Sequence, residues 1–174
     1  MLDEATFTQY YEEYIPQIFA YVSRRIKNRD DVEDLVSMIF LKVVEQHDHF
    51  DPAKASFKTW LYKIATNTLI DFFRKQGRTK SDPMDEETAE RIPSEEKSAH
   101  HLTDEHLQKA HVQKIIETLP DRYQEVILLR YFADCSIEEM TQMLDISPNN
   151  TSVLLNRAHT AFMQSYTRLT PTES

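Results

Sequence analysis

The sequence contains very little glycine, and this scarcity excludes several kinds of fold and binding site. Gly77 is the only glycine among 174 residues, whereas an average composition would give about 12. Phosphate-binding loops and dinucleotide-binding folds need several glycines where the backbone approaches phosphate, so both are excluded. Sandwiches and barrels, with their many tight turns, are disfavoured as well. The composition therefore predicts an all-α protein with short connections.

Cysteine and long apolar runs are also scarce. Cys135 is the only cysteine, which excludes an internal disulfide and a cysteine-based zinc site and is typical of a reducing compartment. No apolar run reaches the ~18 residues of a membrane span. Asp3 and Glu4 give the chain an acidic start, unlike a signal peptide. We therefore expect a cytoplasmic protein with no direct membrane insertion.

The sequence shows no pattern typical of a catalytic or metal site. The central histidines lack the i, i+4 spacing and the carboxylate partners of a closed metal site. The acidic residues of segment 82–96 have no rigid pocket around them that would shift their pKa values for acid–base work. We therefore predict no enzymatic activity, no metal and no cofactor.

Positive charge is concentrated in one segment of an acidic chain. The net charge is −9, yet residues 54–80 hold 7 Lys or Arg and 1 Asp or Glu, a local charge of +6. Residues 1–53 carry −6, residues 81–108 carry −7, and residues 109–174 carry −2. Because salt screens each charge within about 10 Å, a compact basic segment predicts a local anionic partner. A solvated helix face remains the alternative explanation.

Apolar spacing predicts three helices in the first half of the chain. The first covers residues 5–28, with Pro16 near a bend or boundary. The second covers 31–47, with Asp30 or Asp31 as its cap and a core-facing stripe that runs from Val32 to Val44. The third follows the loop 48–56 and ends before Gly77, which is expected at the C′ position where positive φ is needed.

Two apolar positions and one aromatic residue in these helices need separate interpretation. Met38 and Leu41 lie on the side of the second helix that is expected to face water. Trp60 lies on the apolar stripe of the third helix. We interpret Trp60 as a core residue rather than a stacking platform for bases.

The second half of the chain predicts a helix-turn-helix. Residues 78–104 are rich in Glu, Ser and Pro and predict a flexible acidic linker. Ser136 and Glu139 form a capping-box pattern, residues 145–147 form a three-residue turn, and Ser147 with Pro148 begins the final helix. Two helices joined in this way fit a helix-turn-helix, although a plain αα-hairpin has a similar pattern.

Three segments together resemble a known family. They are DDVEDLVSMIFLKV (30–43), FDPAKASFKTWLYKIATNTLIDFFRK (50–75) and LPDRYQEVILLRYFADCSIEEMTQMLDIS (119–147). In this order and spacing they resemble the extracytoplasmic-function sigma factors of bacteria. The resemblance implies two helical domains, at 1–77 and 105–170. The first would bind core RNA polymerase and melt the minus-ten element of promoter DNA, and the second would read the minus-thirty-five element.

The resemblance also assigns residues to three surfaces. The helix 31–47 would bind the clamp of the largest catalytic subunit of core RNA polymerase through Asp34, Leu35, Ser37, Met38, Leu41 and Lys42. The minus-ten surface would comprise Asp51, Lys54, Ser56, Lys58, Lys63, Asn67 and Arg74. The minus-thirty-five surface would comprise Arg130, Asn149, Asn150, Ser152, Val153, Asn156 and Arg157.

The sequence departs from the family pattern in both domains. Ser37 and Met38 stand where Gln and an acidic residue are common in the family. At the start of the final helix, Ser152, Leu154 and His159 match positions that are usually Lys or Arg in the family, and only Arg157 is basic there. Since phosphate contacts supply much of the affinity for duplex, we expect a weak minus-thirty-five contact.

The sequence is compatible with three functions. A promoter-specificity factor for RNA polymerase explains both the basic segment and the helix-turn-helix. A helix-turn-helix regulator acting on duplex alone leaves the basic segment unexplained, and a sigma-like interaction protein would have lost duplex recognition. The family resemblance further implies an anti-sigma factor as a partner, which could hold the protein at the membrane.

Overall fold

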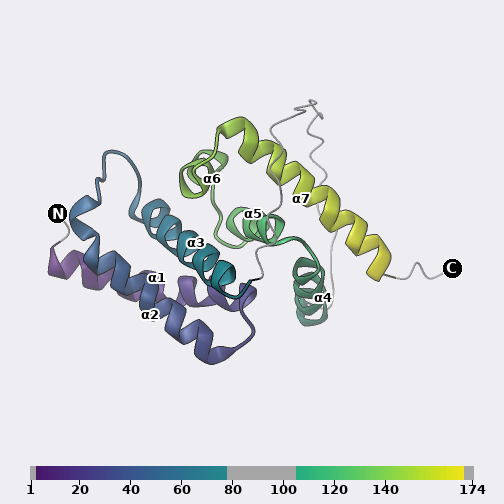
Figure 1. The fold of residues 1–174 in the computed structure, drawn as a ribbon, viewed down its shortest axis with the longest axis horizontal. Helices are drawn as coiled ribbons and strands as arrows, with labels where there is room; N and C mark the ends of the chain where they lie inside the picture. Colours follow the sequence, from purple (N-terminus) through teal and green to yellow (C-terminus); the bar gives the residue numbers. More distant parts are fainter. Residues whose placement is uncertain (1–2, 78–104, 171–174) are drawn as a thin grey trace.

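The computed structural model describes residues 3–77 and 105–170, and all regular secondary structure within them is helical (Figure 1). The first unit contains α1 (Glu4–Arg25), α2 (Arg29–Glu45), the short 3-10 helix η1 (His47–His49) and α3 (Phe57–Lys75). The second unit contains α4 (Glu105–Glu117), α5 (Asp121–Tyr131), α6 (Ile137–Leu144) and α7 (Pro148–Leu169). The predicted linker, 78–104, lies outside the described residues.

The three long helices of the first unit pack side by side, with α2 in contact with both α1 and α3. The cap of α2 differs from the prediction, because the side chain of Asn28 accepts the bond from Asp31 N at 3.1 Å. Asp30 and Asp31 lie instead in the first turn, where negative charge is favourable. Pro16 lies inside α1 rather than at its boundary.

A side-chain cap begins α3 and a glycine in the C′ position ends it. The Ser56 side chain accepts from Thr59 N at 3.1 Å, which satisfies one of the amides left unpaired at a helix start. At the other end, Gly77 follows the C-cap residue Gln76 and has φ +67°, which confirms its predicted C′ position. Glycine adopts this left-handed conformation without a Cβ clash.

The helix-turn-helix is confirmed by its local geometry. Ser136 and Glu139 form a capping box at the start of α6. Asp145 has φ +56° and ends α6, and the side chain of Ser147 caps α7, with Pro148 in the first turn. Helix α5 packs against both α6 and α7, and Gln124, Glu125, Val126, Ile127, Leu128 and Leu129 are all buried. A helix buried on all sides needs neighbours on more than one face.

The second unit also packs against the first unit. Helix α3 packs against α6 (Figure 1), and the buried apolar side chains of both units form one continuous cluster. The sequence predicts two domains and a linker but gives no sign of this contact. In the part of the chain that the structure describes, no helix is both long and apolar enough to cross a membrane.

Candidate protein and nucleic-acid interfaces

Helix α2 presents an apolar strip to solvent. Met38, Leu41 and Val44 are 45%, 57% and 47% exposed, and their spacing of three residues places them along one side of the helix. The prediction placed Val44 in the core stripe and is wrong. Val43, one position earlier, is buried, and a step of one residue turns a side chain by about 100°.

The remaining residues predicted on this helix fall into three environments. Asp34 and Ser37 are exposed beside the apolar strip. Lys42 is half-buried, and its Nζ donates to Thr68 Oγ1 of α3 at 3.1 Å. Leu35 is 3% exposed and belongs to the core, so its side chain cannot form part of an external contact surface while the helix stays packed.

The loop before α3 is organised by its own side chains. Asp51 accepts from Ala53 N at 3.0 Å and lies 3.6 Å from Lys54 Nζ. Phe50 packs against Phe57 and Trp60, with ring centroids 5.7 Å and 5.2 Å away. Trp60 is half-buried at the edge of this aromatic group, so the predicted core role describes only part of its surface.

The cationic residues of α3 and the loop before it, and Asn67 among them, differ in how accessible they are. Lys54, Asn67 and Arg74 are exposed and Lys63 is half-buried, with Arg74 Nη1 at 3.3 Å from Asp71 Oδ1. Lys63, Asn67 and Arg74 share one side of α3 by helical spacing, and Lys54 and Arg74 each lie beside a carboxylate, Asp51 and Asp71. Lys58 differs, because its Nζ donates to the Asp134 carbonyl of the second unit at 3.1 Å.

The start of α7 carries the residues predicted to read duplex DNA. Asn149, Asn150, Asn156 and Arg157 are exposed, and Ser152 and Val153 are half-buried. Positions 149, 152, 153 and 156 share one face by helical spacing.

Two side chains next to this face are engaged within the protein. Arg130 Nη1 donates to the Cys135 carbonyl at 2.9 Å and so holds the loop before α6. His159 contacts the Tyr131 hydroxyl, and burial lowers the pKa of its imidazole.

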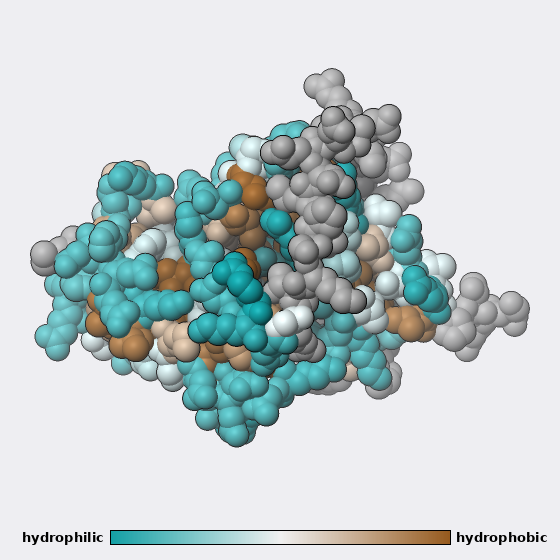
Figure 2. All heavy atoms as spheres, viewed as in Figure 1, coloured by the Kyte–Doolittle hydropathy of each residue, from teal (hydrophilic) through white to brown (hydrophobic). Residues whose placement is uncertain are grey.

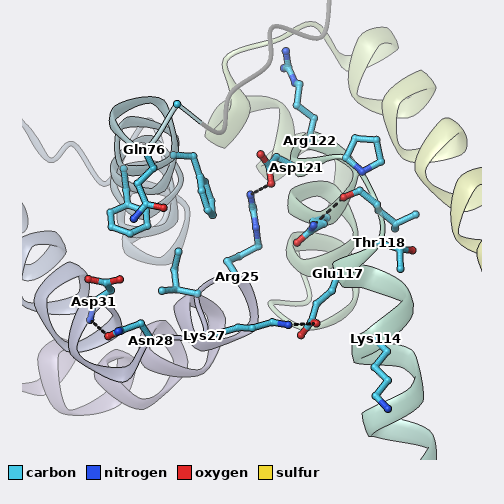
Figure 3. Close-up of a pocket in the computed structure, with 17 residues that line it drawn as sticks. Arg25, Lys27, Asn28, Asp31, Gln76, Lys114, Glu117, Thr118, Asp121 and Arg122 are labelled. Atoms are coloured by element: carbon cyan, nitrogen blue, oxygen red, sulfur yellow. Dashed lines mark hydrogen bonds and ion pairs between the residues drawn. The ribbon is translucent and has the colours of Figure 1, made fainter.

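A cleft of about 1050 Å³ separates the ends of α1 and α3 from α4 and the start of α5 (Figure 3). Two ion pairs cross it. Lys27 Nζ lies 2.7 Å from Glu117 Oε2, and Arg25 Nη2 lies 3.7 Å from Asp121 Oδ1. The bond from Lys27 holds the pKa of the Glu117 carboxyl below its usual value.

Sequence reasoning missed these pairs, because their members lie far apart in the chain and follow no spacing rule.

Figure 2 shows mainly hydrophilic residues on the viewed face of the molecule, with hydrophobic residues in smaller groups. Within residues 3–77 and 105–170, no group of three or more His, Cys, Asp or Glu side chains could hold a metal ion.

Comparisons with known proteins match both units. The chain matches Sigma-70 region 2 over residues 10–79 and Sigma-70 region 4 over residues 110–160. It is 30% identical to the RNA polymerase sigma factor SigV of Bacillus subtilis, over 87% of this chain and 82% of SigV. It is 27% identical to the ECF RNA polymerase sigma factor SigW of the same species, over 91% and 88%.

Two solved structures share the fold. The sigma factor RpoE of Bartonella quintana, crystallised with the anti-sigma factor NepR, gives a TM-score of 0.68 at 23% identity. The match covers 95% of this chain and 98% of that chain. The structure of CnrH with the cytosolic domain of CnrY gives the same TM-score at 21% identity, over 97% of this chain and 92% of that chain.

Proposed function

Because this chain belongs to the extracytoplasmic-function family of RNA polymerase sigma factors, which direct core polymerase to promoters, we propose a division of labour among its surfaces. Residues 1–77 bind core polymerase and open the minus-ten element, and residues 105–170 contact the minus-thirty-five element. Residues 78–104 connect the two domains. The apolar strip on α2 is the observation that carries this proposal.

The strip on α2 binds the clamp of the largest catalytic subunit. Three large apolar side chains in a row on one helix face are typical of residues that become buried in a protein interface. Asp34 and Ser37 supply polar contacts at the edge of the strip, and the bond from Lys42 to Thr68 joins this helix firmly to α3. A polymerase contact on α2 therefore positions α3 as well.

The loop 50–56 and helix α3 bind single-stranded promoter DNA. Lys54, Lys63 and Arg74 provide positive charge along the path of the strand, and Ser56 and Asn67 provide hydrogen-bonding groups between them. Trp60 packs against Phe50 and Phe57 and supports this loop from the side of the core. Asp51 orients the loop through its contacts with Ala53 and Lys54.

The start of α7 makes a weaker contact with duplex DNA. Asn149, Asn156 and their neighbours can pair with adenine in the major groove, but Arg157 is the only basic residue among them. Arg130 donates a hydrogen bond to the Cys135 carbonyl, which leaves fewer of its N–H groups free to bind a phosphate. Core polymerase therefore supplies most of the affinity for the promoter.

An anti-sigma factor regulates this protein in the cytoplasm. In the two solved structures named above, RpoE is bound to the anti-sigma factor NepR and CnrH is bound to the cytosolic domain of CnrY. A partner that covers the α2 strip would compete directly with core polymerase for the same apolar side chains. Attachment of that partner to the membrane would hold the sigma factor there.

Reconstitution with sigma-free core polymerase tests the function. We expect the protein plus core to give defined transcript starts from a library of bacterial genomic fragments, and core alone to give none. Promoter duplex bound equally well without core would support an ordinary helix-turn-helix regulator instead. Core binding without transcripts would support an interaction protein that has lost promoter recognition.

A further inference from the structure

We propose that Tyr10, on the first helix, positions the loop 50–56 against α3 and so determines how well the minus-ten contact discriminates between bases. The inference rests on the proposed binding of promoter DNA by this loop, and it gives α1 a part in base selection. Tyr10 acts through Phe57 without touching DNA itself, so it is a positioning residue.

Phe57 lies at the centre of an aromatic cluster. It is the first residue of α3 and is 5% exposed. The ring centroids of Tyr10, Tyr14, Phe50 and Trp60 lie 4.2, 5.6, 5.7 and 5.8 Å from its own. Aromatic rings at such distances attract each other by more than their buried area explains. The cluster therefore ties α1 to the start of α3.

The loop before α3 begins and ends in this cluster. Phe50 is its first residue and Phe57 follows its last, and their rings meet edge to face with an interplanar angle of 84°. Between them, Lys54 N and Ala55 N donate to the Asp51 carbonyl at 3.0 and 3.3 Å. Because the loop has its own hydrogen bonds and is held by a ring at each end, we expect it to move as one piece when the cluster shifts.

Tyr10 makes the shortest of the ring contacts to Phe57. The two rings stack with an interplanar angle of 12°, whereas Tyr14 is tilted by 51°. A parallel stack fixes the plane of the Phe57 ring, and Phe57 joins the loop to the helix. Tyr10 is half-buried, so its replacement removes the stack without emptying the centre of the core.

A small displacement of the loop affects base selection more than attraction to phosphate. The Coulomb energy between a lysine and a phosphate falls only with the inverse of their distance, so Lys54 keeps most of its attraction. Hydrogen bonds weaken steeply outside a narrow range of distance and angle, and an unstacked base is read through such bonds. Loss of the Tyr10 ring should therefore lower discrimination between bases while polymerase binding is retained.

Four variants isolate the ring of Tyr10. Tyr10→Ala removes it, Tyr10→Leu keeps apolar bulk without a flat ring, and Tyr10→Phe keeps the ring. Tyr11→Ala is the matched control, because it removes the same side chain from the next position of α1. The Tyr11 ring lies 4.8 Å from Phe40 of α2, whereas Tyr10 stacks on Phe57. Circular dichroism should show that all four variants remain helical.

Trp60 reports on the cluster in the free protein. It is the only tryptophan of the chain, and its ring lies 5.2 Å from Phe50 and 5.8 Å from Phe57. Acrylamide quenching of its fluorescence measures how accessible it is. We expect the quenching constant to rise in Tyr10→Ala and Tyr10→Leu and to equal the wild-type value in Tyr10→Phe and Tyr11→Ala. Equal quenching in the wild type and Tyr10→Ala would overturn the positioning role.

Transcription by the complex with core polymerase measures base selection. The template is a promoter recovered from the genomic-fragment reconstitution, with its minus-ten element randomised. Sequencing of transcripts and templates gives the preference for the best base over the others at each position. We expect the strongest preference to fall about fivefold in Tyr10→Ala and to fall in Tyr10→Leu as well. It should stay within about twofold of the wild type in Tyr10→Phe and Tyr11→Ala, and the Kd for core polymerase should stay within about twofold in all four variants.

The two measurements separate the claims. Increased quenching with an unchanged base preference in Tyr10→Ala would overturn the role in base selection. An equal fall of the preference in Tyr11→Ala would indicate a general loss of stability and would overturn that role as well. If quenching changes as expected but the wild type gives no promoter-dependent transcripts, the proposed function is refuted instead.

Discussion

The apolar strip on α2 gives a quantitative prediction for polymerase binding. We consider the double variant Met38→Ala/Leu41→Ala. Both side chains are substantially exposed in the free protein, so their truncation leaves no cavity in the core and the fold should be retained. Alanine is also a strong helix former, which keeps α2 intact.

The expected loss follows from the exposed fractions. Complete burial of a leucine or methionine side chain contributes about 1.5–3 kcal/mol. Since Leu41 is 57% and Met38 is 45% exposed, about half of this amount, roughly 1 kcal/mol each, is available on association. Loss of about 2 kcal/mol corresponds to about a 30-fold weaker Kd.

Fluorescence anisotropy with labelled sigma factor and core polymerase measures this Kd directly. The matched control is Leu169→Ala, which truncates a leucine of similar exposure, 45%, at the far end of α7. We expect the control to bind within about twofold of the wild type. A double variant that also binds within this range, with an unchanged melting curve, would refute the clamp contact on α2.

Three stability predictions follow from individual contacts, each measured by thermal unfolding. Gly77→Ala should lower Tm by about 2–4 °C, because φ +67° is unfavourable for alanine even though no atom lies within 4 Å of the new Cβ; an unchanged Tm would contradict the role of the glycine. Ser136→Ala should lower Tm by a similar amount, about 2–4 °C, because it removes the side chain that accepts from Glu139 N at 3.1 Å in the capping box. A Tm equal to that of the wild type would show that this cap adds nothing to stability. Burial raises the pKa of Glu125 against the opposing effects of Arg25 and Arg122, with Asp121 adding to the rise. The folded state therefore gains stability below the ordinary glutamate pKa and loses it as pH rises through the raised value, so Glu125→Gln should flatten the fall of Tm with pH; parallel curves would refute this.

Local features of the fold are predictable from the sequence because short-range rules decide them. Ser136 with Glu139, Ser147 with Pro148, and Gly77 after α3 each follow from caps and turns within a few residues. The same rules misplaced the cap of α2, since asparagine and aspartate are equally suitable caps and only the chain path selects position 28. The exposed position of Val44 was also predictable, because Val44 lies three residues after Leu41 and helical spacing places both on the same side of α2.

The contact between the units is not predictable in this way. Lys58 and Asp134, or Lys27 and Glu117, are far apart in the chain, and no spacing rule connects them. The burial of all six residues 124–129 shows that α5 has neighbours on several sides, but this burial is known only from the folded chain. Charge in the sequence indicated where DNA should bind, but only the folded chain shows that Lys58 is engaged.

Permanganate footprinting of the promoter complex tests the central claim most directly. The measurement compares unpaired thymines at the minus-ten element in complexes made with wild type, with Lys54→Ala/Lys63→Ala/Arg74→Ala, and with Arg157→Ala. We predict strong reactivity for the wild type and for Arg157→Ala, and loss of reactivity for the triple variant although it still binds core polymerase. Full reactivity in the triple variant, or loss confined to Arg157→Ala, would contradict the assignment of promoter opening to α3.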